Sequence, residues 1–362
     1  MESFRDLAGR FDILPIDIVV QLNAIAEGRG RETAARLRHP RQLETLREVA
    51  IVQSIDTSNA IEGITAPAAR IEALAAHKTT PRNRSEQEIA GYQYALTQIH
   101  KHAAEIPFEP RYVQQLHGYV YRFTAVRHAG RFKTMDNTVK ERRPDGAMVL
   151  RFVPVDAART PPAMDELHHA FATEVELGTI PYPLLCAAYL LDFLTTHPFT
   201  DGNGRMARLI TLWLLYRGGF GVGRYISLER LIAETKEDYY ATLGASTAGW
   251  HENRHDLLPW ARYLLGVFVA AYAEFDDQME MLDTPVADRL DAIHRRIGVW
   301  PRDEFTAAEL HATLRGVTRE TLARALRGLR EEGSLERLGA GRGTRWRRVA
   351  GAARWQESPS SD

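Results

Sequence analysis

The segment from His197 to Arg208, His-Pro-Phe-Thr-Asp-Gly-Asn-Gly-Arg-Met-Ala-Arg, concentrates more reactive chemistry than the rest of the chain. An unperturbed histidine has a pKa of about 6.5, so His197 can accept a proton at neutral pH. Asp201 supplies the hard carboxylate oxygens that Mg²⁺ prefers. Gly202 and Gly204 let the backbone approach a phosphate closely, because no side chain intervenes. The combination predicts a site that holds a nucleotide's phosphates beside a metal ion and a general base.

Two apolar helices are predicted to position this segment. Leucines and alanines at helical spacing predict one helix over about 183–196, and a second apolar pattern runs on to Gly218. Pro198 ends the first helix, because a proline disfavours helical geometry in the residue before it. The loop therefore leads into a helix N-terminus, whose unpaired N–H groups and dipole attract anions. Arg205 and Arg208, three residues apart, are predicted to project from its first turn toward the same anion.

Two other loop classes do not fit these residues. The segment lacks the Gly-Lys-Ser/Thr ending of a Walker loop. It begins like a calcium loop, with Asp201 and Asn203, but Met206 stands where a glycine is needed and Leu212 where a bidentate glutamate is needed. A polar turn between helices with a capping aspartate is the remaining alternative. Such a turn rarely needs two glycines, two arginines and a histidine together.

The whole segment His197 to Arg208 resembles the active-site motif of the Fic family, His-Pro-Phe-x-Asp-Gly-Asn-Gly-Arg-x-x-Arg, without a departure. Most Fic proteins that resemble this chain transfer AMP from ATP to a Ser, Thr or Tyr hydroxyl group of a target protein. The resemblance implies that His197 deprotonates the target hydroxyl group. It also implies that Asp201 holds Mg²⁺ against the α- and β-phosphates of ATP.

The resemblance further implies where the nucleotide binds. The region Gly202 to Gly204 would cradle phosphate, while Arg205 and Arg208 would grip the β- and γ-phosphates. Positioning and charge stabilisation would supply most of the catalysis. The nucleotide-binding residues predicted in this way are Glu62, His197, Gly202, Asn203, Gly204, Arg205, Met206, Ala207, Arg208 and Tyr240.

A second pattern, Ser58-Asn59-Ala60-Ile61-Glu62-Gly63, lies upstream. Isoleucines at roughly helical spacing predict a helix over about 43–62, which Gly63 would end. Ser58 and Glu62 share one helix face, a spacing that by itself is typical of a solvated surface. Beside the first motif it resembles the Fic inhibitory helix, Ser/Thr-x-x-x-Glu-Gly/Asn. The resemblance implies that Glu62 pairs with Arg208 and inhibits the enzyme, and leaves open whether Glu62 also helps to remove AMP from modified targets.

Two further segments resemble parts of a Fic core. Residues 130–134, followed by 137–139, are predicted to form short extended segments around a turn. They resemble the family's β-hairpin flap, which adds a strand of the target; an ordinary surface hairpin is the alternative. Tyr240, which follows Tyr239, resembles the tyrosine that stacks on adenine. Some relatives have an asparagine where this chain has Thr247, which leaves the base contacts open.

The predicted fold class is mainly α: a Fic helical core with a small β-hairpin flap, an N-terminal helical region and a C-terminal winged helix-turn-helix. The predicted regions are 1–104 with the inhibitory helix, 105–275 for the Fic core, 284–350 for the winged helix and 351–362 for a tail. Residues 315–348 contain ten arginines and four glutamates, a charge excess that suits the phosphate backbone of DNA. Protein binding or simple packing is the alternative for this domain.

Composition limits the remaining classes. The 362-residue chain has a formal net charge of −1, which excludes a global attraction to nucleic acid or membranes. Its one cysteine, Cys186, lies among apolar residues and is expected to be buried. The first residues lack the apolar segment of a secretory signal, and the longest apolar run, around 264–273, is too short to span a bilayer. A cytoplasmic protein without membrane contact is therefore expected, with His168 and His169 at its surface.

Two function classes stay open. The first is an auto-inhibited protein adenylyltransferase that uses ATP and Mg²⁺ and modifies hydroxyl groups of target proteins. Self-modification, AMP removal and a homodimer are further options that the family implies. The second is a DNA-binding transcriptional regulator whose Fic-type core senses a nucleotide or uses another phosphate-containing donor. Label transfer lost in His197→Ala would support the first class, and salt-dependent DNA binding that survives this change would support the second.

Overall fold

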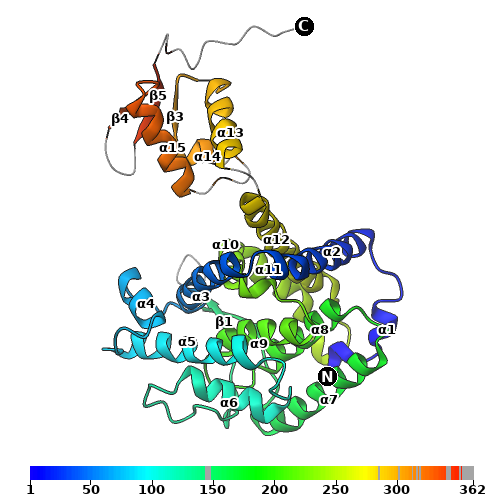
Figure 1. The fold of residues 1–362 in the computed structure, drawn as a ribbon. Coiled ribbons are helices and arrows are strands. Elements are labelled where there is room, and N and C mark those ends of the chain that lie inside the picture. Colours follow the sequence, from blue (N-terminus) through cyan, green and yellow to red (C-terminus); the bar gives the residue numbers. More distant parts are fainter. Residues whose placement is uncertain are drawn as a thin grey trace. The chain divides into compact units, whose positions relative to one another are not determined.

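The computed structural model describes residues 1–142, 148–283, 286–300, 302–311, 313–314, 317, 319–339, 344–349 and 352. They form two compact units, Met1–Phe275 and Asp276–Asp362. The fold is mainly helical with two small sheets, which confirms the predicted class (Figure 1). The boundary residues 284–285, the wing tip 340–343 and the tail apart from Ala352 are predictions that lie outside the described residues.

Helices make up most of the first unit. Its elements are η1 (Glu2–Phe4), α1 (Leu7–Arg10), α2 (Ile16–Arg38), α3 (Pro40–Ile61), α4 (Ala68–Ala75), α5 (Arg84–His102), α6 (Pro110–Val120), β1 (Val139–Arg142), β2 (Met148–Phe152), η2 (Ala157–Arg159), α7 (Thr160–Leu177), α8 (Tyr182–Thr196), α9 (Asn203–Arg217), η3 (Val222–Arg224), α10 (Leu228–Glu234), α11 (Lys236–Thr247), η4 (Trp250–Glu252) and α12 (Leu258–Asp283), the last of which runs past the boundary between the units.

Helices α8 and α9 form the centre of this unit. Every residue of α8 from Pro183 to Thr196 is buried, as is every residue of α9 from Arg205 to Tyr216. A helix that is apolar on all sides must be covered on all sides, and α7, α5, α3 and α6 pack around this pair (Figure 1). The motif loop thus joins the two most completely buried helices of the unit. Cys186 lies in α8 and is buried, as predicted.

Helix α3 brings the second sequence motif against this centre. It packs against α10, α5 and α9, and buries Ser54, Ile55, Ser58 and Asn59. The helix ends as the sequence predicts: Gly63 takes a left-handed conformation with φ of 77°, and the Ile64 N–H bonds the Asn59 carbonyl at 3.0 Å. Glu62 is consequently presented at the point where the backbone leaves the helix.

The predicted position of the β-hairpin is wrong. The antiparallel strands are β1 and β2, farther along the chain, and residues 130–134 are irregular. The reason is that the earlier segment makes other bonds. Gly130 adopts φ of 72°, and the Lys133 N–H bonds the Pro198 carbonyl at 2.8 Å, so this backbone follows the motif loop instead of a sheet. Residues 143–147, between the strands, lie outside the described part of the chain.

The second unit combines helices with an antiparallel sheet. After the end of α12 it contains α13 (Val286–Gly298), β3 (Glu304–Thr306), α14 (Ala307–His311), α15 (Arg319–Glu331), β4 (Leu335–Leu338) and β5 (Arg345–Arg348). The strand order is β3-β5-β4. Ile293, Phe305, Leu326 and Trp346 are among the buried residues of its core. Strand β3 is absent from the sequence prediction.

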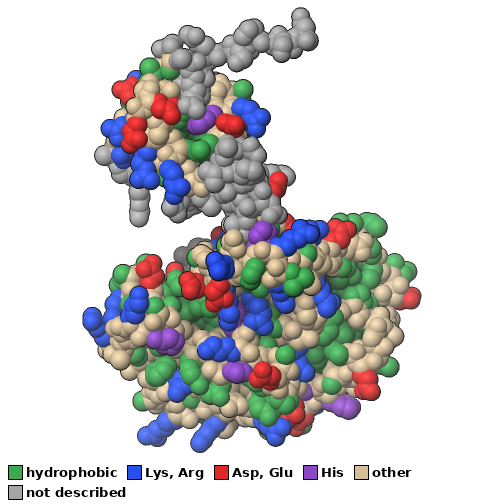
Figure 2. Space-filling model, in the orientation of Figure 1, with side chains coloured by type: hydrophobic (Ala, Val, Ile, Leu, Met, Phe, Trp, Pro, Cys, Tyr) green, Lys and Arg blue, Asp and Glu red, His purple; other side chains and the backbone are tan. Residues whose placement is uncertain are grey.

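The prediction that both His168 and His169 lie at the surface is wrong for one of them. His169 is exposed, but His168 is buried, with Nδ1 at 2.8 Å from the Met164 carbonyl and Nε2 at 3.1 Å from the Tyr189 hydroxyl. Acidic and basic side chains are both scattered over the visible face of the first unit, among hydrophobic and uncharged ones (Figure 2). Among the described residues, no helix combines the length and the apolar composition that crossing a bilayer requires.

Candidate active site

His197 lies directly after the end of α8. Its backbone adopts φ of 48° and ψ of 59°, a left-handed conformation that is uncommon for a residue other than glycine. Such conformations persist where the surroundings hold them, and they are frequent in active sites. Pro198 follows and prevents the helix from continuing. The imidazole is therefore placed by a sharp change of chain direction between two buried helices.

The loop after His197 is held by bonds within itself and from α6. The Asn203 side chain bonds the backbone of Phe199 twice, through Oδ1 to its N–H at 2.9 Å and through Nδ2 to its carbonyl at 2.8 Å. His117 stacks on Phe199 with ring centroids 3.9 Å apart and an angle of 1°. The Gly130 N–H donates to Nδ1 of His117, so Nε2 carries the proton that points at the Asp201 carbonyl, 3.1 Å away.

Helix α9 begins immediately after this loop and presents its N-terminus to the end of α3. Gly202 precedes α9 with φ of 79°, and helix geometry leaves the first-turn N–H groups without partners in the helix. The carboxylate of Glu62 lies against this turn: a Cβ atom added to Gly204 would stand 2.3 Å from Glu62 Oε1. A negative charge thus sits at the positive end of a helix dipole.

The same carboxylate pairs with Arg208. The Arg208 guanidinium donates through Nη2 to Glu62 Oε1 at 2.8 Å. It also donates through Nε to the hydroxyl of Ser58 and through Nη2 to the Ser58 carbonyl, at 2.8 and 2.9 Å. Arg208 is only 3 % exposed, so it is surrounded by these partners. The structure brings together Ser58, Glu62 and Arg208, three residues that the sequence analysis selected from distant segments.

Arg205 points elsewhere. Its Nη2 atom lies 2.9 Å from Glu88 Oε2 and 2.7 Å from the hydroxyl of Tyr121, and its side chain is 1 % exposed. Nη1 approaches Asn59 Oδ1 at 3.5 Å. The two motif arginines therefore do not meet at the carboxylate of Glu62: Arg208 faces it, and Arg205 is part of a separate buried ion pair.

The other predicted nucleotide contacts differ in accessibility. Met206 and Ala207 are buried in α9, so they contribute packing and backbone rather than accessible side chains. Tyr239 is buried, whereas Tyr240 is 45 % exposed and packs edge to face against it, with ring centroids 5.1 Å apart. Burial raises the pKa of Tyr240; the charge of Glu62 acts in the same direction, and the charge of Arg208 opposes it.

The environment of His197 favours its neutral form. Burial lowers the pKa of His197 to about 4, and the positive charge of Lys133 acts in the same direction. A backbone hydrogen bond with Leu194 and the charges of Glu62 and Asp201 oppose this shift. At neutral pH the imidazole is uncharged and able to accept a proton.

Sequence reasoning missed several residues that shape the site. Glu88 and Tyr121 bind Arg205, His117 supports the loop, and Lys133 contacts it through two backbone carbonyls. They come from α5, from α6 and the residue that follows it, and from the segment before β1, at least 60 positions from the motif. The only local signal was the sequence Gly-Arg-Phe-Lys at 130–133, which was interpreted as part of a strand.

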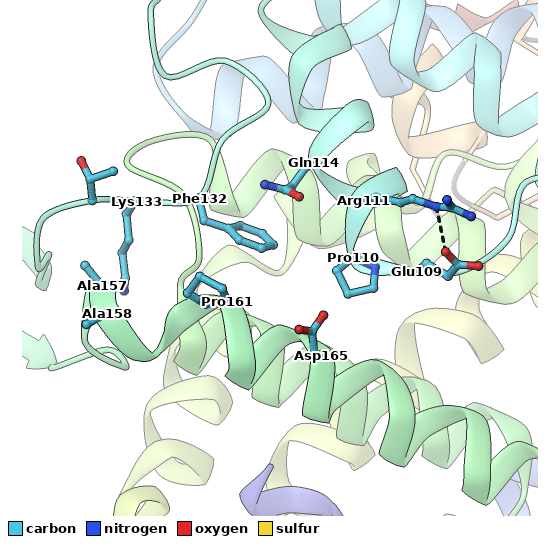
Figure 3. Close-up of a pocket in the computed structure, with 11 residues that line it drawn as sticks. Glu109, Pro110, Arg111, Gln114, Phe132, Lys133, Ala157, Ala158, Pro161 and Asp165 are labelled. Atoms are coloured by element: carbon cyan, nitrogen blue, oxygen red, sulfur yellow. Dashed lines mark ion pairs between the residues drawn. The ribbon is translucent and has the colours of Figure 1, made fainter.

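An open pocket of about 830 Å³ lies beside the loop (Figure 3). It is lined by the start of α6, by Phe132 to Thr134 and by the start of α7, where Pro161 and Asp165 face it. None of the predicted site residues lines it. Lys133 is its link to the motif, because the same side chain bonds the Thr196 carbonyl at 3.0 Å.

Residues 107–215, within the first unit, match the sequence model of the Fic/DOC family. They include the motif loop from His197 to Asn203. The match spans less than a third of the chain and includes α6, the hairpin, α7, α8 and most of α9.

Two curated proteins are similar to parts of the chain. The protein adenylyltransferase fic-1 of Caenorhabditis elegans is 32 % identical over 116 residues, and that of Caenorhabditis briggsae is 41 % identical over 68 residues. These alignments cover 32 % and 19 % of this chain, but only 20 % and 11 % of the length of the two relatives.

Solved structures share the fold. A Fic family protein from Desulfovibrio desulfuricans covers 93 % of this chain and 97 % of its own, with a TM-score of 0.59 and 24 % identity. A Fic domain containing signaling protein from Bacteroides thetaiotaomicron covers 69 % of this chain and 95 % of its own, with a TM-score of 0.58 and 21 % identity. Fic-1 from C. elegans covers 74 % of both chains, with a TM-score of 0.54 and 23 % identity.

Proposed function

We propose that the chain is a protein adenylyltransferase that transfers AMP from ATP to hydroxyl groups of target proteins and is inhibited by its own Glu62. The observation that carries the proposal is the contact of Glu62 with both Arg208 and the first turn of α9. A helix N-terminus beside a buried arginine attracts an anion, and here a carboxylate of the same chain fills that place. The relatives named protein adenylyltransferase support the activity.

The nucleotide site is assembled from α9 and α11. With Glu62 displaced, the terminal phosphate of ATP would bind the Arg208 guanidinium and the free N–H groups at the start of α9. Gly204 permits this approach, since any larger side chain would occupy the space above the turn. The half-exposed ring of Tyr240 is available to stack on adenine. Arg205 keeps its ion pair with Glu88 and supports the turn from behind.

The reaction is an in-line displacement at the α-phosphorus. The hydroxyl oxygen of the target forms a bond to that phosphorus, and the bond from phosphorus to the bridging β-phosphate oxygen breaks. Pyrophosphate leaves with the electron pair, and the neutral imidazole of His197 takes the hydroxyl proton. Positioning of the reactants by rigid helices lowers the entropic part of the barrier.

Asp201 fits a magnesium ion that arrives with ATP. Mg²⁺ usually binds one or two carboxylates together with substrate phosphates. Asp201 is exposed near the end of the loop, two residues before α9, and its Oδ1 atom accepts the Gly202 N–H at 2.7 Å, which orients the carboxylate. Among the described residues no three or more His, Cys, Asp or Glu side chains could hold a metal by themselves. The ion, when bound, would neutralise phosphate charge.

Inhibition follows from competition between two anions. The carboxylate of Glu62 and the terminal phosphate of ATP require the same guanidinium, and Arg208 is held toward α3 by Ser58 as well. A buried guanidinium that loses its carboxylate without a replacement is strongly destabilised, so the pair opens only when another anion takes its place. While Glu62 remains paired with Arg208, bound ATP would lie in an unproductive position.

Strands β1 and β2 provide a surface for the target. Among the described residues these two strands pair only with each other, so their outer edges can accept a further strand. Leu150 and Val153 are about half exposed on this hairpin and its continuation. A target segment added there would be recognised through its backbone.

Intact-mass spectrometry tests the proposed function. Glu62→Gly protein is incubated with Mg²⁺ and each nucleoside triphosphate in turn, alone and with an extract as a source of targets. We expect a mass increase equal to one AMP with ATP, and none in the Glu62→Gly/His197→Ala protein. A mass increase with a different nucleotide, or by a different group, would identify another donor. The absence of a covalent product with every nucleotide would contradict a transferase.

A second candidate function concerns the unit Asp276–Asp362. Its order of one helix, one strand, two helices and two strands agrees with a winged helix-turn-helix, in which α15 would enter the major groove. Helix α15 exposes Arg324 and Arg327 while its leucines pack into the core. We propose that DNA phosphates are contacted through α15, because these two arginines lie on its exposed face.

Fluorescence anisotropy with a labelled duplex tests this second function. Arg324→Ala/Arg327→Ala should weaken binding at least about tenfold and reduce the slope of log affinity against log salt by about 2. Arg295→Ala on α13 is the matched control and should change neither. Binding that is unaffected by the double substitution, or absent in the parent protein, would exclude this role for α15.

A further inference from the structure

The conformation of His197 needs support from outside α8. The residue is left-handed, with φ of 48°; its N–H makes the last bond of the helix, to the Phe193 carbonyl at 2.9 Å, and the helix ends just where the proposed base is placed. The carbonyl group of Thr196, the last residue of α8, and those of His197, Pro198 and Phe199 have no partner within the helix, so their partners must come from elsewhere.

Lys133 supplies two of these partners. Its ammonium group donates to the Thr196 carbonyl at 3.0 Å, and its backbone N–H donates to the Pro198 carbonyl at 2.8 Å. The side chain is 3 % exposed, which is rare for a lysine unless it has a structural or chemical role. Its contacts flank His197 on both sides.

Asn137 supplies the other two. Its Nδ2 atom donates to the Phe199 carbonyl at 3.1 Å and to the His197 carbonyl at 3.4 Å. Its Oδ1 atom accepts the Lys133 ammonium group at 2.8 Å, which fixes the orientation of the amide. Four consecutive carbonyl groups, at residues 196–199, are thus bound by two residues, three of them by side chains and that of Pro198 by the Lys133 backbone N–H. The Phe199 carbonyl also accepts from Asn203 Nδ2 at 2.8 Å.

We propose that Lys133 and Asn137 are positioning residues that hold His197 in its reactive place relative to the target-binding hairpin, an inference that rests on the proposed function. Asn137 lies two residues before β1, the strand proposed to meet the target. The pair therefore connects the base to the surface that would carry the hydroxyl group. His117 and Asn203 hold the other side of the loop, at Asp201 and Phe199.

This arrangement separates the pair from nucleotide binding. Arg208, the first turn of α9 and Tyr240 have other supports, so a loss of the pair should leave the affinity for ATP nearly unchanged. The distance and direction between imidazole and hydroxyl would change instead, and a displacement of about 1 Å can lower a rate about 100-fold. The expected signature is a lower kcat at an unchanged KM for ATP.

The test uses variants in the Glu62→Gly protein. Asn137→Asp keeps the partner of Lys133 but replaces the amide donor by an oxygen that repels the carbonyls of His197 and Phe199. Lys133→Gln removes the ammonium group, and Lys133→Arg retains a donor. Matched controls at exposed positions are Asn23→Asp on α2 and Lys101→Gln at the end of α5.

We expect Asn137→Asp and Lys133→Gln to lower kcat about 10- to 100-fold with the KM for ATP within about twofold. Lys133→Arg should recover most of the rate, and the two control variants should match the Glu62→Gly protein. Thermal unfolding should identify any variant that fails to fold. A kcat within twofold for both loss variants, or a raised KM at unchanged kcat, would overturn the proposal.

A second measurement does not depend on transfer activity. Carbethoxylation of His197 by diethyl pyrocarbonate, followed by peptide mass, reports how firmly the imidazole is held. The rate of modification depends on exposure of the His197 ring. We therefore expect His197 to be modified at least about threefold faster in Asn137→Asp and Lys133→Gln. His168 should stay protected, as in the parent protein. Equal rates in all variants would reject the positioning role. If the Glu62→Gly protein transfers no AMP while these rates differ, the proposed function fails and the positioning role stands.

Discussion

The Arg208 guanidinium and the Glu62 carboxylate are 2.8 Å apart, although the two residues lie 146 positions apart in the sequence. The arginine is buried in the first turns of α9, and the glutamate is held at the end of α3 by the left-handed Gly63. The pair joins the two sequence motifs in one contact. It is also the contact through which the chain would restrain its own nucleotide site.

Ser58 should contribute to this restraint. Its hydroxyl oxygen accepts the Arg208 Nε–H at 2.8 Å, and a hydrogen bond to a charged group contributes about 1.5–3 kcal/mol. Ser58→Ala should therefore raise AMP transfer about tenfold or more, but less than Glu62→Gly does. Thr57→Ala is the matched control, because the Thr57 hydroxyl bonds only the Gln53 carbonyl of its own helix. Equal rates for Ser58→Ala and Thr57→Ala would contradict the role of Ser58.

Gly204 should be required whether or not Glu62 is present. A methyl group at this position would lie 2.3 Å from the present place of Glu62 Oε1 and 3.4 Å from Arg208 Nη1, in the space assigned to phosphate. In the Glu62→Gly protein, Gly204→Ala should lower transfer at least about tenfold, equivalent to about 1.4 kcal/mol. Gly244→Ala on α11 is the control, since a methyl group there meets nothing within 4 Å. A fully active Gly204→Ala protein would show that the phosphate does not bind at this turn.

The pH dependence of transfer should reveal the environment of His197. Its pKa is lowered to about 4, chiefly by burial, and the Glu62 charge opposes this shift. The Glu62→Gly protein should therefore keep a constant kcat/KM from pH 8 down to at least pH 5, because the imidazole stays unprotonated. A rate that falls by half near pH 6.5 would show an exposed, ordinary histidine as the base.

The buried histidines should make the fold sensitive to acid. Burial lowers the pKa of His117, His168 and His255 to about 4, and that of His100 to about 3. Between pH 6.5 and 4 the unfolded chain binds these protons and the folded chain does not, so stability falls as pH falls. Asp192 acts in the opposite direction, because burial raises its pKa to about 6.

Urea unfolding at pH 7 and pH 5 measures this balance. Each neutral histidine contributes up to about 1.4 kcal/mol per pH unit below its unfolded pKa, and we expect a net loss of at least about 2 kcal/mol. His168→Gln should reduce the pH dependence, and His169→Gln, at an exposed neighbour, should not. A stability that is unchanged or higher at pH 5 would contradict the burial of neutral imidazoles.

Local signals in the sequence predicted much of the fold. Pro198 and Gly63 mark helix ends that depend on their own backbone preferences, and both ends lie where expected. Strand β3 was missed because three residues carry little periodicity, and its pairing with β5 joins Glu304 to Arg347 across 43 positions. The hairpin was misplaced because the segment at Lys133 bonds the motif loop, a partner that the local sequence does not reveal.

The candidate site, like the fold, could be predicted only in part from the sequence. The pairing of Glu62 with Arg208 followed from the resemblance, but the orientation of Arg205 did not, because Glu88 lies 117 positions upstream on α5. Spacing places two arginines on one helix face and does not specify which carboxylate each one meets. Tertiary packing decides that choice.

The rate of AMP transfer with and without Glu62 tests the central claim most directly. Parent, Glu62→Gly and Glu62→Gly/His197→Ala proteins are incubated with Mg²⁺ and ATP labelled in the α-phosphate, and protein-bound label is followed with time. Release of Arg208 should make Glu62→Gly at least about tenfold faster than the parent, and loss of the base should return the rate to background. A Glu62→Gly protein no faster than the parent, or one whose labelling survives the loss of His197, would contradict the account.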